Sequence, residues 1–282
     1  MSANYYYLVA GLPDLLLDEG RQPLTCGDFI LEASEQLNKN DFSLFKLLQL
    51  PFDNENLIAL LLKKERPFSP LGSIDEEELT DGLKNPDTLP VYMETFIESF
   101  HENRSQAPGL IPADQLAWFF YDEMTRHREP FIAEWYCFDL NLRNVIAGIN
   151  CRREFAHLEE LATEREKAAA STVIGRDDVA DAIIRSNAPD FGLTMQLPWI
   201  ERVVALSRES IQEFEKGVDT LRWDVLNEMT ITSHFRAETV FAFFIKLAMV
   251  ERWQALDPKT GQEQLERLVD ELTASYAVPA DF

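Results

Sequence analysis

The chain has 282 residues, 46% of them hydrophobic, and its 49 acidic and 26 basic residues give a formal charge of −23 at pH 7. A chain of this length and composition can bury a large core and divide into two or three lobes. The negative charge repels phosphate backbones and anionic lipid headgroups, so it argues against nucleic acid as a partner. We expect this charge to keep the protein in solution or to meet a basic partner surface.

Neither the cysteines nor the apolar segments indicate export or membrane insertion. Cys26, Cys137 and Cys151 are odd in number and widely spaced, which predicts reduced and mostly buried thiols rather than a disulfide framework. The N-terminus lacks a basic region before an apolar run, so we expect no signal peptide. The longest apolar stretch, residues 240–250, would span roughly 16 Å as a helix, against ~30 Å for a bilayer core. These features predict a cytoplasmic protein without a transmembrane segment.

Apolar residues recur at helical spacing along most of the chain, which predicts an all-α protein. Asp41 or Ser43 suits the start of a helix, and we expect Asp114 and Asp177 to cap two further helices. Ser233 precedes the most hydrophobic segment, whose apolar residues lie nearly all round a helix and predict a position in the interior. The expected helices span residues 24–38, 41–48, 54–64, 91–102, 116–128, 130–165, 177–185, 198–221, 233–253 and 262–276.

Breaks between these helices predict how the chain is divided. Residues 67–90 combine prolines, glycines and acidic residues, which is typical of a linker or an insertion. Further breaks are expected at residues 107–112 and 186–192. The sequence therefore predicts a multi-lobed helical scaffold, whose lobes either stand apart or interweave into one compact body. The expected lobes are residues 1–66, 91–185 and 186–282.

Two Glu-x-x-His spacings suggest a metal site. Glu98 and His101 form one pair, and Glu154 and His157 form the other. Di-metal carboxylate proteins use two such pairs together with a glutamate from each of two further helices. The alternative is that both pairs lie on helix surfaces, since an acidic residue three positions before a histidine is common in a chain with 49 acids. We favour this alternative and expect no bound metal or other cofactor.

A helical unit with polar residues among apolar ones occurs twice. Its first copy contains Asp53 and Asn56, its second contains Asp139, Asn141 and Arg143, and a basic pair follows each copy. Polar side chains in such a helix need partners. They either form a hydrogen-bond network that fixes how two helices cross, or they contact another subunit. No nucleophile elbow, glycine-rich phosphate loop or Cys-x-x-Cys motif occurs, so the repeat indicates a scaffold rather than an enzyme.

Residues 5–14, YYYLVAGLPD, resemble a bacterial family of unknown function, typical of the Bacteroidetes, whose genes lie within V-type ATPase operons. Over nearly its whole length the chain is also similar, more remotely, to the C/d subunit of the V/A-type ATPase central stalk. Three places carry this resemblance: the two helical units and residues 238–253, which contain Glu251 and Arg252. The third place lacks the Asn-Leu dipeptide of the first, and residues 67–90 have no counterpart in the stalk protein.

The resemblance implies a non-catalytic, all-α cup of three related lobes that lies between the rotor shaft and the membrane ring. It also implies the other V-type ATPase subunits as partners, a role in proton or sodium transport, and a peripheral location at the inner membrane. Two alternatives remain, namely a di-metal oxidoreductase built on the Glu-x-x-His pairs and an acidic adaptor that binds a peptide or helix in a groove. The structural or interaction residues implied are Asp53, Asn56, Asp139, Asn141, Arg143, Glu251 and Arg252.

Overall fold

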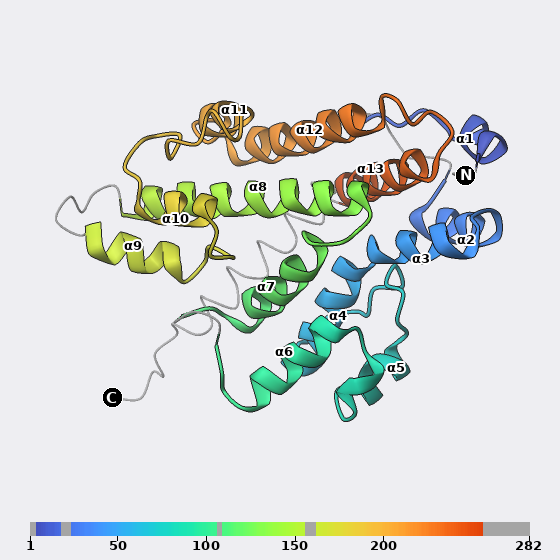
Figure 1. The fold of residues 1–282 in the computed structure, drawn as a ribbon, viewed down its shortest axis with the longest axis horizontal. Coiled ribbons are helices and arrows are strands. Elements are labelled where there is room, and N and C mark those ends of the chain that lie inside the picture. The colour runs from blue at the N-terminus through green and yellow to red at the C-terminus, as the bar shows by residue number, and fades with distance from the viewer. Residues whose placement is uncertain (1–3, 18–23, 106–108, 156–161, 256–282) are drawn as a thin grey trace, which may run out of the picture.

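Every regular element that the structure describes is a helix. The computed structural model describes residues 4–17, 24–105, 109–155 and 162–255, which contain thirteen α-helices and one short 3-10 helix. The predicted all-α class is therefore confirmed. Figure 1 shows α8 (Pro130–Glu154) crossing the middle of the molecule, with α12 (Ile211–Thr230) on one side and α4 (Leu50–Leu61) and α7 (Pro112–Met124) on the other. Helix α13 (Ala237–Ala255) lies beside the N-terminal end of α8.

The remaining helices surround this centre. At one end of the molecule lie α1 (Tyr6–Gly11), α2 (Cys26–Gln36) and α3 (Lys39–Leu47), as Figure 1 shows. At the opposite end lie α9 (Ala162–Ala170) and α10 (Asp178–Arg185). The other elements are α5 (Glu76–Gly82), the 3-10 helix η1 (Pro86–Thr88), α6 (Val91–His101) and α11 (Ile200–Leu206).

Side chains at the helix N-termini explain where several helices begin. Asp177 accepts a hydrogen bond from an amide in the first turn of α10 and caps that helix, as predicted. The start of α3 lies earlier than predicted, because Asn38 rather than Asp41 or Ser43 accepts hydrogen bonds from two amides of the first turn. The prediction that Asp114 caps α7 is wrong, since this residue lies inside the first turn and its carboxylate pairs with α8.

The predicted single helix over residues 198–221 is also wrong. The chain forms α11 and then begins α12 after a break, at which Ser210 and Glu213 make a capping box. In this arrangement the Ser210 hydroxyl accepts a hydrogen bond from the Glu213 amide, and the Glu213 carboxylate accepts one from the Ser210 amide. Two amides that a helix terminus would leave without partners are thereby satisfied, so the break is stable without glycine or proline.

Helix α4 covers a different range from the predicted 54–64. It begins at Leu50 because Pro51 fits the first turn of a helix, where a backbone N–H is not needed. It ends at Leu61, and Lys63 adopts a left-handed φ of 51°, which a continuing helix cannot contain. The shift brings Asp53 into the first turn, where a carboxylate is favoured by the helix dipole.

Residues 67–90 are partly helical and packed against the rest of the structure. They contain α5, which starts with a capping box of Asp75 and Glu78, and the short helix η1. Leu79 of α5 is fully buried, and Leu89 is nearly so. Apolar residues of this segment, which the sequence predicted to be a linker or an insertion, therefore reach the core.

Helix α13 lies in the interior, as its apolar composition predicted. Phe241, Phe244 and Leu247 are at most 1% exposed. Phe29 of α2 and Phe45 of α3 lie with their ring centroids 6.5 and 4.8 Å from that of Phe244. Helices near the N-terminus therefore share a core with the last helix described.

The start of α13 lies four residues beyond the predicted Ser233, and the helix predicted over 262–276 falls outside the described residues.

The structure shows the burial of the three cysteines and the hydrophobicity of the helices. Cys26 and Cys151 are buried, Cys137 is exposed, and all three are free thiols. Among the described residues, no helix combines the length and the hydrophobicity needed to cross a bilayer.

Candidate functional site

The polar residues of α4 hold the segment that follows the helix. Asn56 forms two hydrogen bonds with the backbone of Ser69: its side-chain amide donates to the carbonyl at 3.0 Å, and its oxygen accepts from the amide at 2.8 Å. Asp53, which is fully buried, accepts hydrogen bonds of 3.0 Å from the amide and from the hydroxyl of Ser73 and one of 3.1 Å from the Ile74 amide. We call this arrangement the α4 clamp, and it places residues 69–74 ahead of α5.

The α4 clamp leaves little space around its carboxylate. A Cβ atom added to Gly72 would lie 2.1 Å from Oδ1 of Asp53, so only glycine fits this position. Burial raises the pKa of Asp53 above its ordinary value, although the hydrogen bonds from Ser73 and Ile74 act in the opposite direction. Desolvation of the charged form therefore outweighs the contribution of the donors.

A second clamp of the same kind occurs on α8. Asn144 donates a hydrogen bond to the carbonyl of Ile174 at 2.7 Å and accepts one from the amide of the same residue at 2.8 Å. This α8 clamp holds the turn before α10, whose cap is Asp177. Asn141, one of the residues expected to form such contacts, instead donates to the Cys137 sulfur at 3.7 Å within its own helix. The residue equivalent to Asn56 is thus Asn144.

Arg222 of α12 lies between two carboxylates from different helices. Its guanidinium contacts Oδ1 of Asp139, on α8, at 3.3 Å and Oδ1 of Asp219 at 3.1 Å. The other oxygen of Asp139 accepts a hydrogen bond of 2.6 Å from the hydroxyl of Tyr121, on α7. Burial lowers the pKa of Arg222, but the two carboxylates outweigh this effect and raise it, so the guanidinium stays charged. These contacts join α7, α8 and α12.

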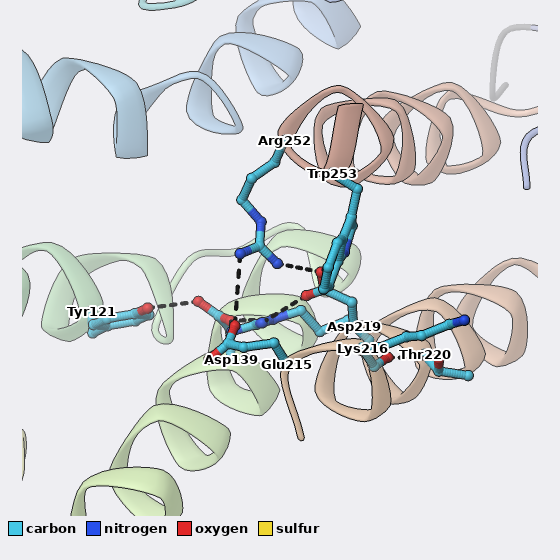
Figure 2. A network of polar contacts seen from close by, with 9 residues as sticks. Tyr121, Asp139, Glu215, Lys216, Asp219, Thr220, Arg252 and Trp253 are labelled. Atoms are coloured by element: carbon cyan, nitrogen blue, oxygen red, sulfur yellow. Dashed lines mark hydrogen bonds and ion pairs between the residues drawn. The ribbon is translucent and has the colours of Figure 1, made fainter. Parts of the chain in front are cut away.

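Helix α13 enters this network through its last turn, as Figure 2 shows. Arg252 and the indole nitrogen of Trp253 both donate to Oδ2 of Asp219, and the indole bond measures 2.7 Å. Arg252 also lies 3.7 Å from the carboxylate of Glu215. Asp219 is only 1% exposed, and three donors satisfy its charge. We refer to Tyr121, Asp139, Asp219, Arg222, Arg252 and Trp253 together as the polar network.

The neighbouring Glu251 connects α13 to the N-terminal helices. Its Oε1 accepts a hydrogen bond of 2.7 Å from the amide of Cys26, in the first turn of α2. A carboxylate at this end of a helix is stabilised by the helix dipole. Burial raises the pKa of the Cys26 thiol, and the thiol's hydrogen bond to Glu251 and the charge of that carboxylate raise it further, so this thiol stays protonated.

The last of the residues implied by the resemblance, Arg143, forms an ion pair of 2.5 Å with Asp114 of α7. Both side chains are mostly buried, with exposed fractions of 32% and 14%. All seven implied residues except Asn141 thus contact a different structural element. The contacts that the structure describes are internal, and they hold helices and turns against one another.

The Glu-x-x-His residues do not converge in the part of the chain that the structure describes. Glu98 and His101 are exposed near the end of α6, and Glu154 is exposed at the end of α8. His157 falls outside the described residues. Within the described ranges, no three His, Cys, Asp or Glu side chains lie close enough together to hold a metal ion.

A cavity of about 780 Å³ lies where α4, α8, α12 and α13 meet. Phe52, Trp135 and Phe244 contribute aromatic surface to its wall, and four members of the polar network, Asp139, Asp219, Arg222 and Arg252, contribute charges. Its volume falls within the range of about 300 to 1,000 Å³ that is usual for ligand sites. The cavity and the polar network together form the candidate functional site, because this is where the helices of the resembling motifs meet.

Residues 1–275 match a family described as "Protein of unknown function (DUF2764)". The chain belongs to this family. The expectation of a family of unknown function is confirmed, and the match covers nearly the whole chain. No curated protein and no solved structure shows a significant match.

Several residues of the site in this family member were not predicted from the sequence. Asn144 was detectable, because Asn141 and Asn144 repeat the spacing of Asp53 and Asn56. Arg222 gave no local signal, since its partner Asp139 lies 83 positions away in the chain. A buried aspartate and an arginine three positions later on α12 would have been noticed only with knowledge of which face that helix buries.

Proposed function

We propose that this protein is a non-catalytic central-stalk subunit or accessory of a V/A-type rotary ATPase, linking the rotor shaft to the membrane ring. One observation carries the proposal: the polar residues on which the resemblance to the central stalk rests hold helices together. Asp139 and Arg252, from two of the resembling segments, are joined through Asp219 and Arg222 of α12. A body that transmits torque must resist relative movement of its helices, and buried, satisfied polar networks provide such rigidity.

The composition supports the same proposal. A chain with a formal charge of −23 is attracted to a basic neighbour and repelled by anionic lipid headgroups, so it would reach the membrane through other subunits. The protein would then occupy the cytoplasmic side of the inner membrane as a peripheral component of the complex. Its role in proton or sodium transport would be mechanical coupling, without chemistry of its own.

Co-purification tests this proposal directly. The tagged full-length protein is isolated from native membranes in mild detergent, and the accompanying chains are identified by mass spectrometry. We expect ATPase catalytic and ring subunits, with recovery that falls when the salt concentration rises, because exposed charge pairs are screened. The untagged strain, carried through the same steps, is the control.

The other outcomes separate the alternatives. Recovery of a different protein in stoichiometric amounts, without ATPase subunits, would replace the proposal with the acidic adaptor. Iron or manganese in the pure protein, again without ATPase subunits, would replace it with the di-metal oxidoreductase.

A further inference from the structure

The cavity beside the polar network has the chemistry of a ligand site that is independent of any ATPase partner. Its aromatic side chains come from three helices: Phe52 on α4, Trp135 and Tyr136 on α8, and Phe244 on α13. The faces of aromatic rings attract cations as well as apolar groups. A wall of this kind therefore suits a molecule that is apolar along its length and positive at one end.

The charges on the wall are not balanced. Four carboxylates and three guanidinium groups line the cavity, and each guanidinium has an acidic partner. Arg66 pairs with Glu55 at 2.6 Å, and Arg222 and Arg252 both pair with Asp219. Among the described residues, no lysine, arginine or histidine pairs with Glu251, the fourth carboxylate.

One oxygen of Glu251 is engaged by the Cys26 amide, which fixes the position of the carboxylate. The Cys26 thiol also hydrogen-bonds to this carboxylate, but the described contacts give it no cationic partner, and the residue is partly exposed on the cavity wall. A charged hydrogen-bond acceptor fixed beside aromatic surface is the arrangement that binds an ammonium group.

We propose that the cavity between α4, α8, α12 and α13 binds a small amphiphilic amine, with its apolar body against the aromatic wall and its ammonium group on Glu251. The volume of about 780 Å³ favours a small molecule, because ligand sites usually measure about 300 to 1,000 Å³. The negative charge of the chain raises the local concentration of cations around the site. The ATPase proposal neither requires this ligand nor excludes it.

The first experiment compares three probes of equal chain length, octylamine, octanol and octanoate, by isothermal titration calorimetry with the full chain at neutral pH. We expect octylamine to bind about tenfold more tightly than octanol, because only the ammonium group can use the Glu251 carboxylate. Octanoate should bind most weakly. Equal affinity for all three probes, or no binding of octylamine up to its solubility limit, would overturn the proposal.

Two variants then locate the site. Glu251→Gln keeps an oxygen for the Cys26 amide and removes only the charge, so octylamine affinity should fall about tenfold while octanol affinity stays unchanged. Glu201→Gln, an exposed residue on α11 outside the cavity, is the matched control and should change neither affinity.

Ala248→Trp places a large side chain on the cavity wall and should abolish binding of both octylamine and octanol. Its thermal unfolding curve shows whether the variant is folded, and the Glu251→Gln result stands independently if it is not. Undiminished octylamine binding in Glu251→Gln, or in a folded Ala248→Trp, would contradict the assignment.

Discussion

The α4 clamp and the α8 clamp use the same asparagine geometry but place their aspartates differently. Asn56 and Asn144 each hold one residue of the turn ahead by two hydrogen bonds to its backbone. In the α4 clamp, Asp53 completes the local contact with residues 73 and 74. In α8, Asp139 lies on another part of the helix and contacts Arg222 of α12. The first copy of the helical unit thus holds the turn that follows its own helix, which is a local contact. The second copy attaches α8 to the distant helix α12, which is a long-range contact.

Disrupting the attachment of α8 to α12 should lower the stability of the protein more than disrupting the α4 clamp. Replacing Asp219 by alanine removes a carboxylate that is 1% exposed and leaves Arg222 and Arg252 without their shared partner. Arg222 then keeps only Asp139 and Arg252 keeps only Glu215, 3.7 Å away, so we expect the free energy of unfolding to fall by about 3 kcal/mol, measured by urea denaturation.

The control for this substitution is Asp224→Ala. Asp224 pairs with Arg202 at 2.7 Å, but both side chains are 40% or more exposed. Its loss should cost about 1 kcal/mol or less, because exposed ion pairs contribute little. If the two substitutions cost the same, the polar network is not the principal attachment of α12.

The α4 clamp can be tested by a substitution at Gly72. A methyl group at this position would lie within 2.1 Å of the buried Asp53 oxygen, so Gly72→Ala should cost about 2 kcal/mol or more in unfolding free energy. Gly11→Ala is the matched control, since no atom lies within 4 Å of the added carbon there. A Gly72→Ala variant as stable as the Gly11→Ala variant would show that the α4 clamp is less rigid than the geometry indicates.

The two asparagines allow the clamps to be separated. Asn56→Ala removes two hydrogen bonds to a partly buried backbone and Asn144→Ala two to a buried backbone, which should cost about 2 kcal/mol in each case. Hydrogen exchange should then accelerate at residues 69–74 in the first variant and at residues 173–177 in the second. Faster exchange at both segments in either variant would mean that the clamps form one cooperative unit.

The smallest expected effect is a pH dependence specific to Asp53. Because burial raises its pKa in the folded protein, the folded state binds the proton more tightly than the unfolded state. The cost of ionising this carboxylate is therefore present above its folded-state pKa and disappears as the pH falls through that value towards about 4, the ordinary pKa of an aspartate.

We therefore expect the stability difference between the wild type and Asp53→Asn to grow as the pH is lowered from 7 to 4, in favour of the wild type. Urea denaturation at intervals across this range measures the difference. A difference that is constant, or that shrinks on acidification, would show that hydrogen bonding to Asp53 outweighs its desolvation.

The sequence predicted those parts of the molecule that depend on local physics. The strong periodicity of apolar residues predicted α2, α6 and α13. The cap at Asp177 was predicted correctly because its carboxylate and the Ala180 amide that it binds lie only three residues apart. The break before α12 was missed because Ser210 and Glu213 replace the glycine or proline that usually marks a break. The polar network was missed because its members come from four helices.

The claim that the polar network locks α8 to α12 is tested most directly by a double-mutant cycle on Asp139 and Arg222. The variants Asp139→Asn, Arg222→Met and their combination are compared with the wild type by urea denaturation. Since the two side chains are in contact at 3.3 Å, we expect a coupling energy of about 1 to 3 kcal/mol. Additive effects, with a coupling near zero, would contradict the account of a helical body held rigid by the polar network.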